Sequence, residues 1–128
     1  MPTYLVTGGA GFIGSHIVSA LTQRGGSVRV LDNLSSGSLE NLKGVEQAAE
    51  FIQGDIRDAD HVWEAVAGVD VISHRAALVS VAQSAQQPLL TEDINVVGTL
   101  VLLAAARNAG VRRVVYASSA AVYRVLTV

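Results

Sequence analysis

The sequence predicts an α/β protein in which a parallel sheet of about five strands is covered by helices on both faces. Three observations support this class. Short β-branched runs alternate with longer stretches of helical spacing, the joins between them are short, and half of the 128 residues are apolar. Parallel strands need crossover connections, usually helices, so this alternation predicts right-handed βαβ units. The length is that of one ordinary domain, and residues 1–128 are predicted to form a single one.

The predicted strands are rich in β-branched residues and are bounded by Gly, Asp or Ser. They are residues 3–7, 27–31, 51–53, 70–73 and 113–117. The predicted helices are residues 11–24, roughly 58–67 and roughly 88–108, with a short helix over 38–42. In the longest helix, apolar residues recur at helical spacing, and Gly110 follows as a stop signal.

Composition narrows the range of partners. The net charge is −2 and the largest basic cluster is the pair Arg112 and Arg113, which argues against nucleic acid. Apolar runs are interrupted by charges or glycines before they reach the length of a membrane span, so no membrane partner and no leader peptide are expected. The chain lacks cysteine, a pattern compatible with a cytoplasmic location. Its three histidines have no nearby second ligand, so no metal site is predicted.

A glycine-rich segment, TGGAGFIGSH, joins the first predicted strand to the first helix. Gly9, Gly11 and Gly14 fit the pattern G-x-G-x-x-G, and Gly8 replaces Gly9 in the looser G-x-x-G-x-x-G. Such glycines allow a tight turn and a close approach of the backbone to a pyrophosphate. The helix that begins near Phe12 would direct its free N–H groups at the phosphates. Glycines alone could serve loop conformation, but their place between strand and helix favours a dinucleotide site in a Rossmann-type, doubly wound sheet.

Asp32 ends the next predicted strand, where folds of this kind place an acid that binds the adenosine ribose hydroxyls. An Asp at a strand end could instead form a turn or cap a helix, and the glycine segment favours the ribose interpretation. The Asp32 carboxylate would repel a 2′-phosphate, and residues 33–36 supply no Arg or Lys to neutralise one. The predicted cofactor is therefore NAD rather than NADP.

Five further motifs follow in order: DNLSSG at 32–37, GDIRD at 54–58, SHRAALVSV at 73–81, INVVGT at 94–99 and SSAAVY at 118–123. Together with TGGAGFIGSH they resemble the extended short-chain dehydrogenase/reductases, in the branch of NAD-dependent nucleotide-sugar epimerases and dehydratases. The resemblance covers nearly the whole chain, from Tyr4 to Tyr123. It implies a Rossmann-type sheet that is incomplete relative to the family, without the next strand and without the C-terminal lobe that holds the nucleotide sugar.

The resemblance implies NAD-binding roles for residues in each motif. They are Gly8, Gly11, Phe12, Ile13, Gly14, Asp32, Asn33, Ser35, Ser36, Gly37, Asp55, Ile56, Ala76, Ala77, Asn95 and Ser118. In the family, the residue matching Asp55 meets the adenine amino group, that matching Ile56 packs on the ring, and that matching Asn95 steadies the active-site region. Each has a simpler alternative, because Asp55 could be a turn residue, Ile56 a core residue and Asn95 solvent-facing. His74 is predicted to be structural.

The resemblance also implies hydride chemistry at C4 of a UDP-sugar. In the family, the Tyr of a Tyr-x-x-x-Lys motif takes the hydroxyl proton, NAD takes the hydride, and a Ser or Thr, here Ser119, hydrogen-bonds the same oxygen. The Tyr needs the Lys because a phenol with an ordinary pKa of about 10 is mostly protonated at neutral pH. This dyad is missing: the only lysine, Lys43, has Leu39 at the tyrosine position. A UDP-sugar is therefore expected as a partner only of the full-length relatives.

Two functions remain open from the sequence. The chain is either the NAD-binding portion of a sugar epimerase or dehydratase, inactive alone, or a non-catalytic module that binds or senses NAD. Arg75 and Arg124 depart from the family, which has an apolar residue and a Gly at these positions. Residues 124–128 as a whole suggest a truncation or a shifted reading frame. A sheet edge and a helix face without their usual neighbours predict a homo-oligomer.

Overall fold

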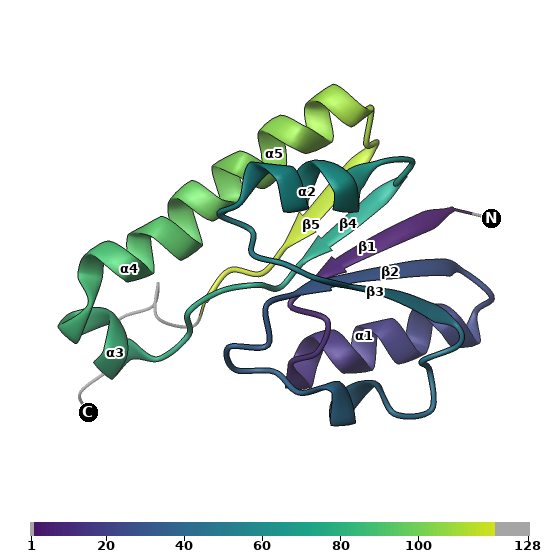
Figure 1. Cartoon of the computed structure of the whole chain (residues 1–128), viewed down its shortest axis with the longest axis horizontal. Coiled ribbons are helices and arrows are strands. Elements are labelled where there is room, and N and C mark those ends of the chain that lie inside the picture. The colour runs from purple at the N-terminus through teal and green to yellow at the C-terminus, as the bar shows by residue number, and fades with distance from the viewer. Residues whose placement is uncertain (1, 120–128) are drawn as a thin grey trace, which may run out of the picture.

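The structure, a computed structural model, describes residues 2–119 (Figure 1). It contains five strands, as predicted, and a short helix over Val81–Gln86 that the sequence did not predict. The predicted helix over roughly 88–108 forms, but with a π-helical stretch inside it. In chain order the elements are β1 (Thr3–Thr7), α1 (Phe12–Gln23), β2 (Ser27–Asp32), the 3₁₀ helix η1 (Leu39–Leu42), β3 (Ala49–Gln53), α2 (Ala59–Val66), β4 (Val71–His74), α3 (Val81–Gln86), α4 (Pro88–Glu92), the π-helix η2 (Asp93–Val97), α5 (Gly98–Ala109) and β5 (Arg113–Tyr116).

All five strands are parallel and lie in the order β3-β2-β1-β4-β5, which confirms the predicted α/β, Rossmann-type sheet. β1 is central and pairs with both β2 and β4. The chain moves outward from β1 to one edge of the sheet and then returns to β1 before it moves to the other. In such sheets, ligands bind beyond the carboxyl ends of the strands, where the strand order reverses.

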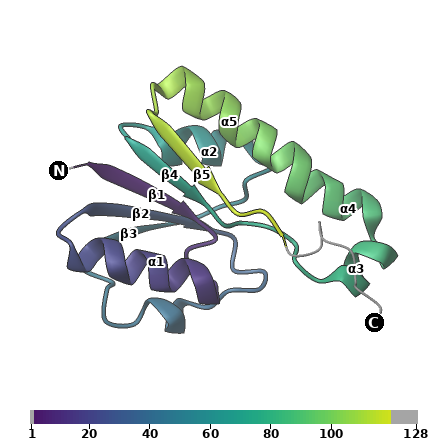
Figure 2. The same ribbon diagram turned by 180° about the vertical axis from the view of Figure 1, so that it is seen from behind.

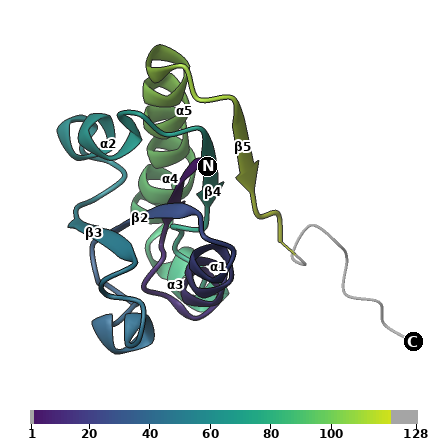
Figure 3. The ribbon, with the colours of Figure 1, turned by 90° about the vertical axis from the view of Figure 1, so that its right-hand side faces the viewer.

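The helices cover both faces of the sheet, with α1 and η1 on one face and α2 and α5 on the other (Figures 1 and 3). Successive residues of a strand point to opposite faces, so each strand supplies both cores. In β1, Leu5 belongs to the core under α2 and α5, while Val6 belongs to the core under α1. Both side chains are fully buried.

The helical segments α4, η2 and α5 follow one another without a break, and α3 and α4 project past the carboxyl ends of the strands (Figure 2). Leu102, Ala105 and Ala106 of α5 are buried in the core shared with α2. Gly110 ends α5 with a φ of 76°, as its position predicted. Leu89 and Leu100 are exposed, at 83% and 60%. An exposed apolar helix face supports the predicted self-association, which stays a prediction.

Within residues 2–119, the stretch Pro88–Ala109 is long and apolar enough to cross a membrane, judged by length and composition alone. The sequence argument expected no such stretch. Core helices of soluble domains meet the same criterion, and α5 packs one side into the core of the sheet. The apolar residues on that side of α5 therefore serve to pack the helix against the sheet.

Candidate dinucleotide-binding site

The glycine segment forms a tight loop between β1 and α1 at the carboxyl edge of the sheet. The Gly11 N–H donates to the Gly8 carbonyl over 3.1 Å, and Gly8 adopts a φ of 66°. α1 begins at Phe12, directly after this turn. The first N–H groups of a helix have no intrahelical acceptor, and the helix dipole favours an anion there. The loop therefore has the geometry of a phosphate site, with Phe12 and Ile13 exposed beside it.

The loop packs backbone against backbone, which leaves no room for side chains. A Cβ at Gly14 would overlap the Gly8 carbonyl oxygen, and one at Gly8 would lie 2.8 Å from the Ala76 nitrogen. A Cβ at Gly37 would lie 2.8 Å from the Ala10 carbonyl oxygen. These close approaches bring together three segments that the sequence motifs assigned to one site: the loops that follow β1, β2 and β4.

Asp32 lies at the end of β2 and is only 8% exposed. Its Oδ2 accepts a hydrogen bond from the Ala10 N–H over 2.9 Å, and its Oδ1 accepts from the Leu34 N–H over 2.8 Å. The second bond belongs to a turn in which Leu34 adopts a φ of 61°. Asp32 therefore does form a turn, which the sequence analysis gave as the alternative to ribose binding. An ionised carboxylate offers about four acceptor positions, so two remain for ribose hydroxyls.

Ala10 is held from the other side by a residue that sequence reasoning missed. Its carbonyl oxygen accepts hydrogen bonds from the Ser38 N–H over 3.0 Å and from Asn41 Nδ2 over 2.8 Å. An isolated Asn in a short helix carries no sequence signal for this role. Asn33, Ser35 and Ser36 lie on the exposed loop between Asp32 and this contact, and the Asn33 Oδ1 accepts from the Ser35 N–H.

The turn after β3 brings Asp55 next to the β2 loop. The Asp55 carboxylate accepts hydrogen bonds from the Arg57 guanidinium and backbone and from Asn33 Nδ2. The Arg57 guanidinium is the main reason that the pKa of Asp55 lies well below its usual range. Ile56 is 5% exposed and lies within contact distance of Gly98 in α5. The structure thus favours the core interpretation of the Ile56 side chain.

A buried polar cluster joins the end of β1 to the end of β4. The Thr7 Oγ1 accepts hydrogen bonds from the Arg75 and Ala76 N–H groups, over 3.0 and 3.1 Å. It also lies 2.6 Å from the Nδ1 of His74, which is 6% exposed. Because the Thr7 oxygen already accepts two N–H bonds, its own proton is left to donate to Nδ1. His74 is therefore a structural residue, as predicted.

The other ring nitrogen of His74 contacts the first turn of α5. Its Nε2 lies 2.9 Å from the Thr99 Oγ1, whose hydroxyl donates to the Asn95 carbonyl over 2.7 Å. The neutral ring with a proton on Nε2 satisfies every partner. Burial, with a smaller effect of the nearby Arg75 charge, lowers the pKa of His74 to about 4. The ring is therefore neutral at physiological pH.

We expect the protein to lose about 2 kcal/mol of stability between pH 7 and pH 5. The unfolded histidine, with a pKa near 6.5, binds a proton in this window, whereas the folded His74 with its lowered pKa does not. Stability is therefore fully present above pH 6.5 and is lost as pH falls towards 4. Urea denaturation at the two pH values measures it. His74→Gln should flatten the dependence and the exposed control His16→Gln should keep it; equal slopes in all three proteins would contradict the assignment.

Asn95 fastens the loop that follows β4. Its Oδ1 accepts from the Leu78 N–H over 2.8 Å, and its Nδ2 donates to the Leu78 carbonyl over 3.0 Å. The residue is thus bonded rather than solvent-facing. Ala76 and Ala77 lie on the same loop, Ala76 partly buried and Ala77 exposed.

Arg75, after β4, and two serines, after β5, also lie at the carboxyl edge of the sheet. The Arg75 Nε donates to the Ser73 Oγ over 3.1 Å, so this guanidinium bonds back to its own strand. β5 ends at Tyr116, one residue earlier than predicted, and Ser118 and Ser119 are exposed beyond it. Arg124 lies outside the described residues.

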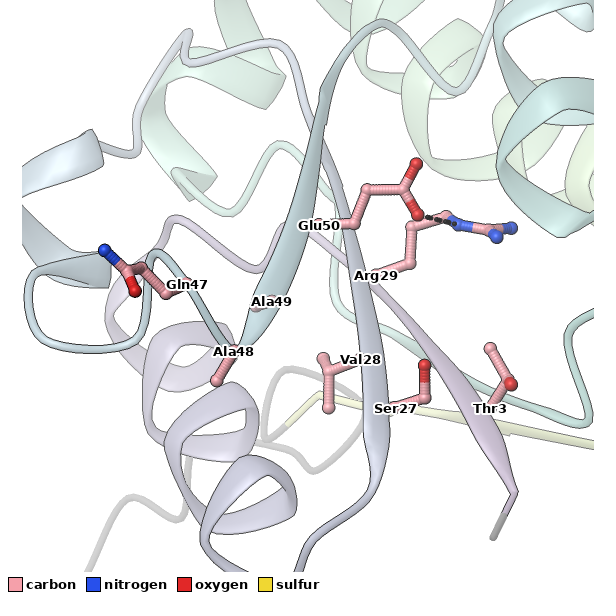
Figure 4. A pocket seen from close by; sticks show the side chains of 8 residues that line it. All are labelled: Thr3, Ser27, Val28, Arg29, Gln47, Ala48, Ala49 and Glu50. Carbon is pink, nitrogen blue, oxygen red and sulfur yellow. Dashed lines mark hydrogen bonds and ion pairs between the residues drawn. The ribbon is translucent and has the colours of Figure 1, made fainter.

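A cavity in the described part of the chain lies at the opposite, amino edge of the sheet (Figure 4). It has a volume of about 290 Å³ and is lined by the first residues of β1, β2 and β3 and by Gln47 and Ala48, which precede β3. Arg29 and Glu50 form an ion pair across it at 2.9 Å. None of the predicted site residues lines it, so the candidate site is the carboxyl edge of the sheet rather than this cavity.

The five-stranded sheet and the loop at its first βα turn define a Rossmann-type domain. Residues 4–127 match the NAD dependent epimerase/dehydratase family. The chain belongs to this family and corresponds to the N-terminal part of a UDP-glucose 4-epimerase-like enzyme.

Similar proteins include curated relatives and solved structures. The UDP-glucose 4-epimerase of Erwinia amylovora is 44% identical over 125 residues, which cover 93% of this chain and 37% of the relative. The crystal structure of UDP-glucose 4-epimerase from Stenotrophomonas maltophila, with bound NAD and formylated UDP-arabinopyranose, is 38% identical with a TM-score of 0.89, over 95% of this chain and 38% of that one. That of Thermus thermophilus, in complex with NAD, is 45% identical with a TM-score of 0.83, over 91% and 37%. The chain thus spans a little over a third of these relatives.

Proposed function

We propose that this chain is the NAD-binding portion of a nucleotide-sugar 4-epimerase or dehydratase and that it binds NAD without catalysing turnover on its own. The observation that carries the proposal is the glycine loop at the start of α1 with the Asp32 carboxylate directly beside it. The loop offers N–H groups to a pyrophosphate, and Asp32 offers acceptors to ribose hydroxyls. Relatives crystallised with NAD support the same cofactor here.

The proposal assigns each of the other predicted residues to the part of the cofactor that its motif would contact. The Asn33–Gly37 loop borders the adenosine ribose, Asp55 receives the adenine amine, and Ala76, Ala77 and Ser118 line the path towards the nicotinamide. Asn95 acts through the loop that it fastens. Ser119 is proposed to hydrogen-bond the sugar oxygen in a full-length enzyme that binds a UDP-sugar, as the relatives' names suggest. A cytoplasmic location remains a proposal from composition.

Titration calorimetry with NAD and NADP tests cofactor binding. We expect NAD to bind and NADP to bind at least tenfold more weakly. A 2′-phosphate beside the Asp32 carboxylate would cost about 1 to 4 kcal/mol, depending on local screening. Absence of NAD binding at millimolar concentration would overturn the proposal, and equal affinity for both cofactors would overturn the role of Asp32.

The same sample tests the proposed lack of turnover. With NAD present, no conversion of UDP-galactose is expected, because no tyrosine of this sequence has a lysine at the Tyr-x-x-x-Lys spacing. The missing dyad also favours the second candidate, a non-catalytic module that binds or senses NAD. Conversion by the pure chain would contradict the proposed inactivity and exclude this second candidate.

A further inference from the structure

The Asp55 carboxylate is the centre of four hydrogen bonds on the turn after β3. Oδ1 accepts from the Arg57 backbone N–H over 2.8 Å and from Arg57 Nε over 3.0 Å. Oδ2 accepts from Arg57 Nη2 over 2.7 Å and from Asn33 Nδ2 over 3.2 Å. A carboxylate has about four acceptor positions, so all of them are occupied in this structure.

Arg57 supplies three of the four donors and holds the carboxylate in one orientation. Its Nε and Nη2 form a paired, two-point contact, which fixes the plane of the carboxylate more firmly than a single charge would. On its other side, Arg57 Nη1 lies 3.5 Å from Asp93 Oδ2 at the start of η2. The guanidinium is thus held between two acids from different elements, and it is only one-third exposed.

Asn33 supplies the fourth donor, which differs from the other three. The contact is the longest of the four and lies at the exposed side of the cluster. Its donor is an amide –NH₂ group, the same kind of donor as the exocyclic amine of adenine. Asn33 also lies on the loop that directly follows Asp32, so its side chain can leave Asp55 without any movement of the sheet.

We propose that Arg57 is a positioning residue that orients Asp55 to recognise an exocyclic amine, and that the Asn33 amide fills this acceptor position until the amine of the nucleotide displaces it. The proposal rests on the proposed function, since it concerns the adenine end of the NAD site. It adds two residues that determine the selectivity for the base. Arg57 raises this selectivity, and Asn33 lowers it by competing with the amine.

The experiment compares NAD with nicotinamide hypoxanthine dinucleotide, which carries a carbonyl oxygen in place of the amine. The measured quantity is the ratio of the two dissociation constants, because contacts shared by both dinucleotides cancel in it. The wild-type chain should prefer NAD by about tenfold or more, the usual effect of one hydrogen bond to a charged group. Arg57→Ala should reduce this preference by at least about threefold. Arg57→Lys should reduce it similarly, because it keeps the charge but loses the paired donors.

Asn33→Ala should change the ratio in the opposite direction. NAD must displace the Asn33 amide from Asp55 and the hypoxanthine analogue need not, so removal of the amide should raise the preference for NAD about two- to fivefold. Any contact of Asn33 with the ribose affects both dinucleotides and leaves the ratio unchanged. Arg24→Ala, an exposed arginine at the far end of α1, is the matched control and should keep the wild-type ratio.

The outcomes separate this proposal from the proposed function. If the wild-type chain binds neither dinucleotide, both fall. If it binds both equally, or if the two Arg57 variants keep the wild-type ratio, the positioning role of Arg57 falls while NAD binding stands. If Asn33→Ala leaves the ratio unchanged or lowers it, the competition by Asn33 is overturned. Circular dichroism of each variant confirms that the comparison is made on folded protein.

Discussion

Gly14→Ala is expected to abolish NAD binding and to destabilise the fold by more than about 3 kcal/mol. The added Cβ would overlap the Gly8 carbonyl oxygen, and it would also lie 2.8 Å from the Gly9 Cα. Both neighbours are backbone atoms of the tight loop, which cannot rotate away as a flexible side chain can. Overpacking within a core typically costs about 1 to 3 kcal/mol, and a clash with fixed backbone exceeds that.

Urea denaturation and NAD titration measure the two effects of Gly14→Ala. The control is Gln23→Ala, which changes an exposed residue at the end of the same helix. This control should keep both the stability and the affinity of the wild-type chain. A Gly14→Ala protein with unchanged stability would show that α1 does not pack as closely on the loop as the structure indicates.

Asp32→Ala is expected to lower stability by about 2 to 4 kcal/mol and to weaken NAD binding at least tenfold. Removal of the carboxylate leaves the Ala10 and Leu34 N–H groups without their acceptor. A buried donor that loses its partner costs about 1 to 3 kcal/mol. The loss of affinity has a separate cause, because the two free acceptor positions proposed for the ribose disappear as well.

Asp32→Asn separates these two effects. It keeps one carbonyl oxygen but removes the charge, so the preference for NAD over NADP should shrink even where stability is partly retained. Glu64→Ala removes an exposed carboxylate from α2 and serves as the charge-matched control. Unchanged stability in Asp32→Ala would contradict the hydrogen bonds of the carboxylate, and an unchanged preference in Asp32→Asn would contradict the electrostatic argument.

Periodicity and turn chemistry were sufficient to predict the sheet and most helices. All five predicted strands form, and their ends differ from the predictions by at most two residues. The segment α3 was missed because none of its residues is buried, so it has no apolar periodicity to detect. The π-helix η2 falls inside the predicted helix over roughly 88–108, but its π-helical form was not predicted, because the spacing of apolar residues does not distinguish one helical hydrogen-bond pattern from another.

The candidate site was less predictable from the sequence than the fold. The glycines and Asp32 carry a motif, and the structure brings them together. Thr7, Arg57 and Thr99 also lie within the quoted motifs, but the sequence assigned them no role. Their roles depend on the partners that the fold brings to them. Thr7 and His74, for example, lie 67 residues apart and meet only because β1 and β4 are neighbours in the sheet.

The central place of β1 also affects the order in which the chain can fold during synthesis. β1 precedes the other described strands, and its partner β2 follows after one helix, so the β1-α1-β2 unit can assemble early from nearby residues. The other edge of β1 has no hydrogen-bond partner until β4 (Val71–His74) has been synthesised. Pairings between distant segments form slowly, so docking of β4 is expected to limit the folding rate. Until then the nascent chain exposes one unpaired edge of β1, and this is the stage at which a chaperone would be of most use.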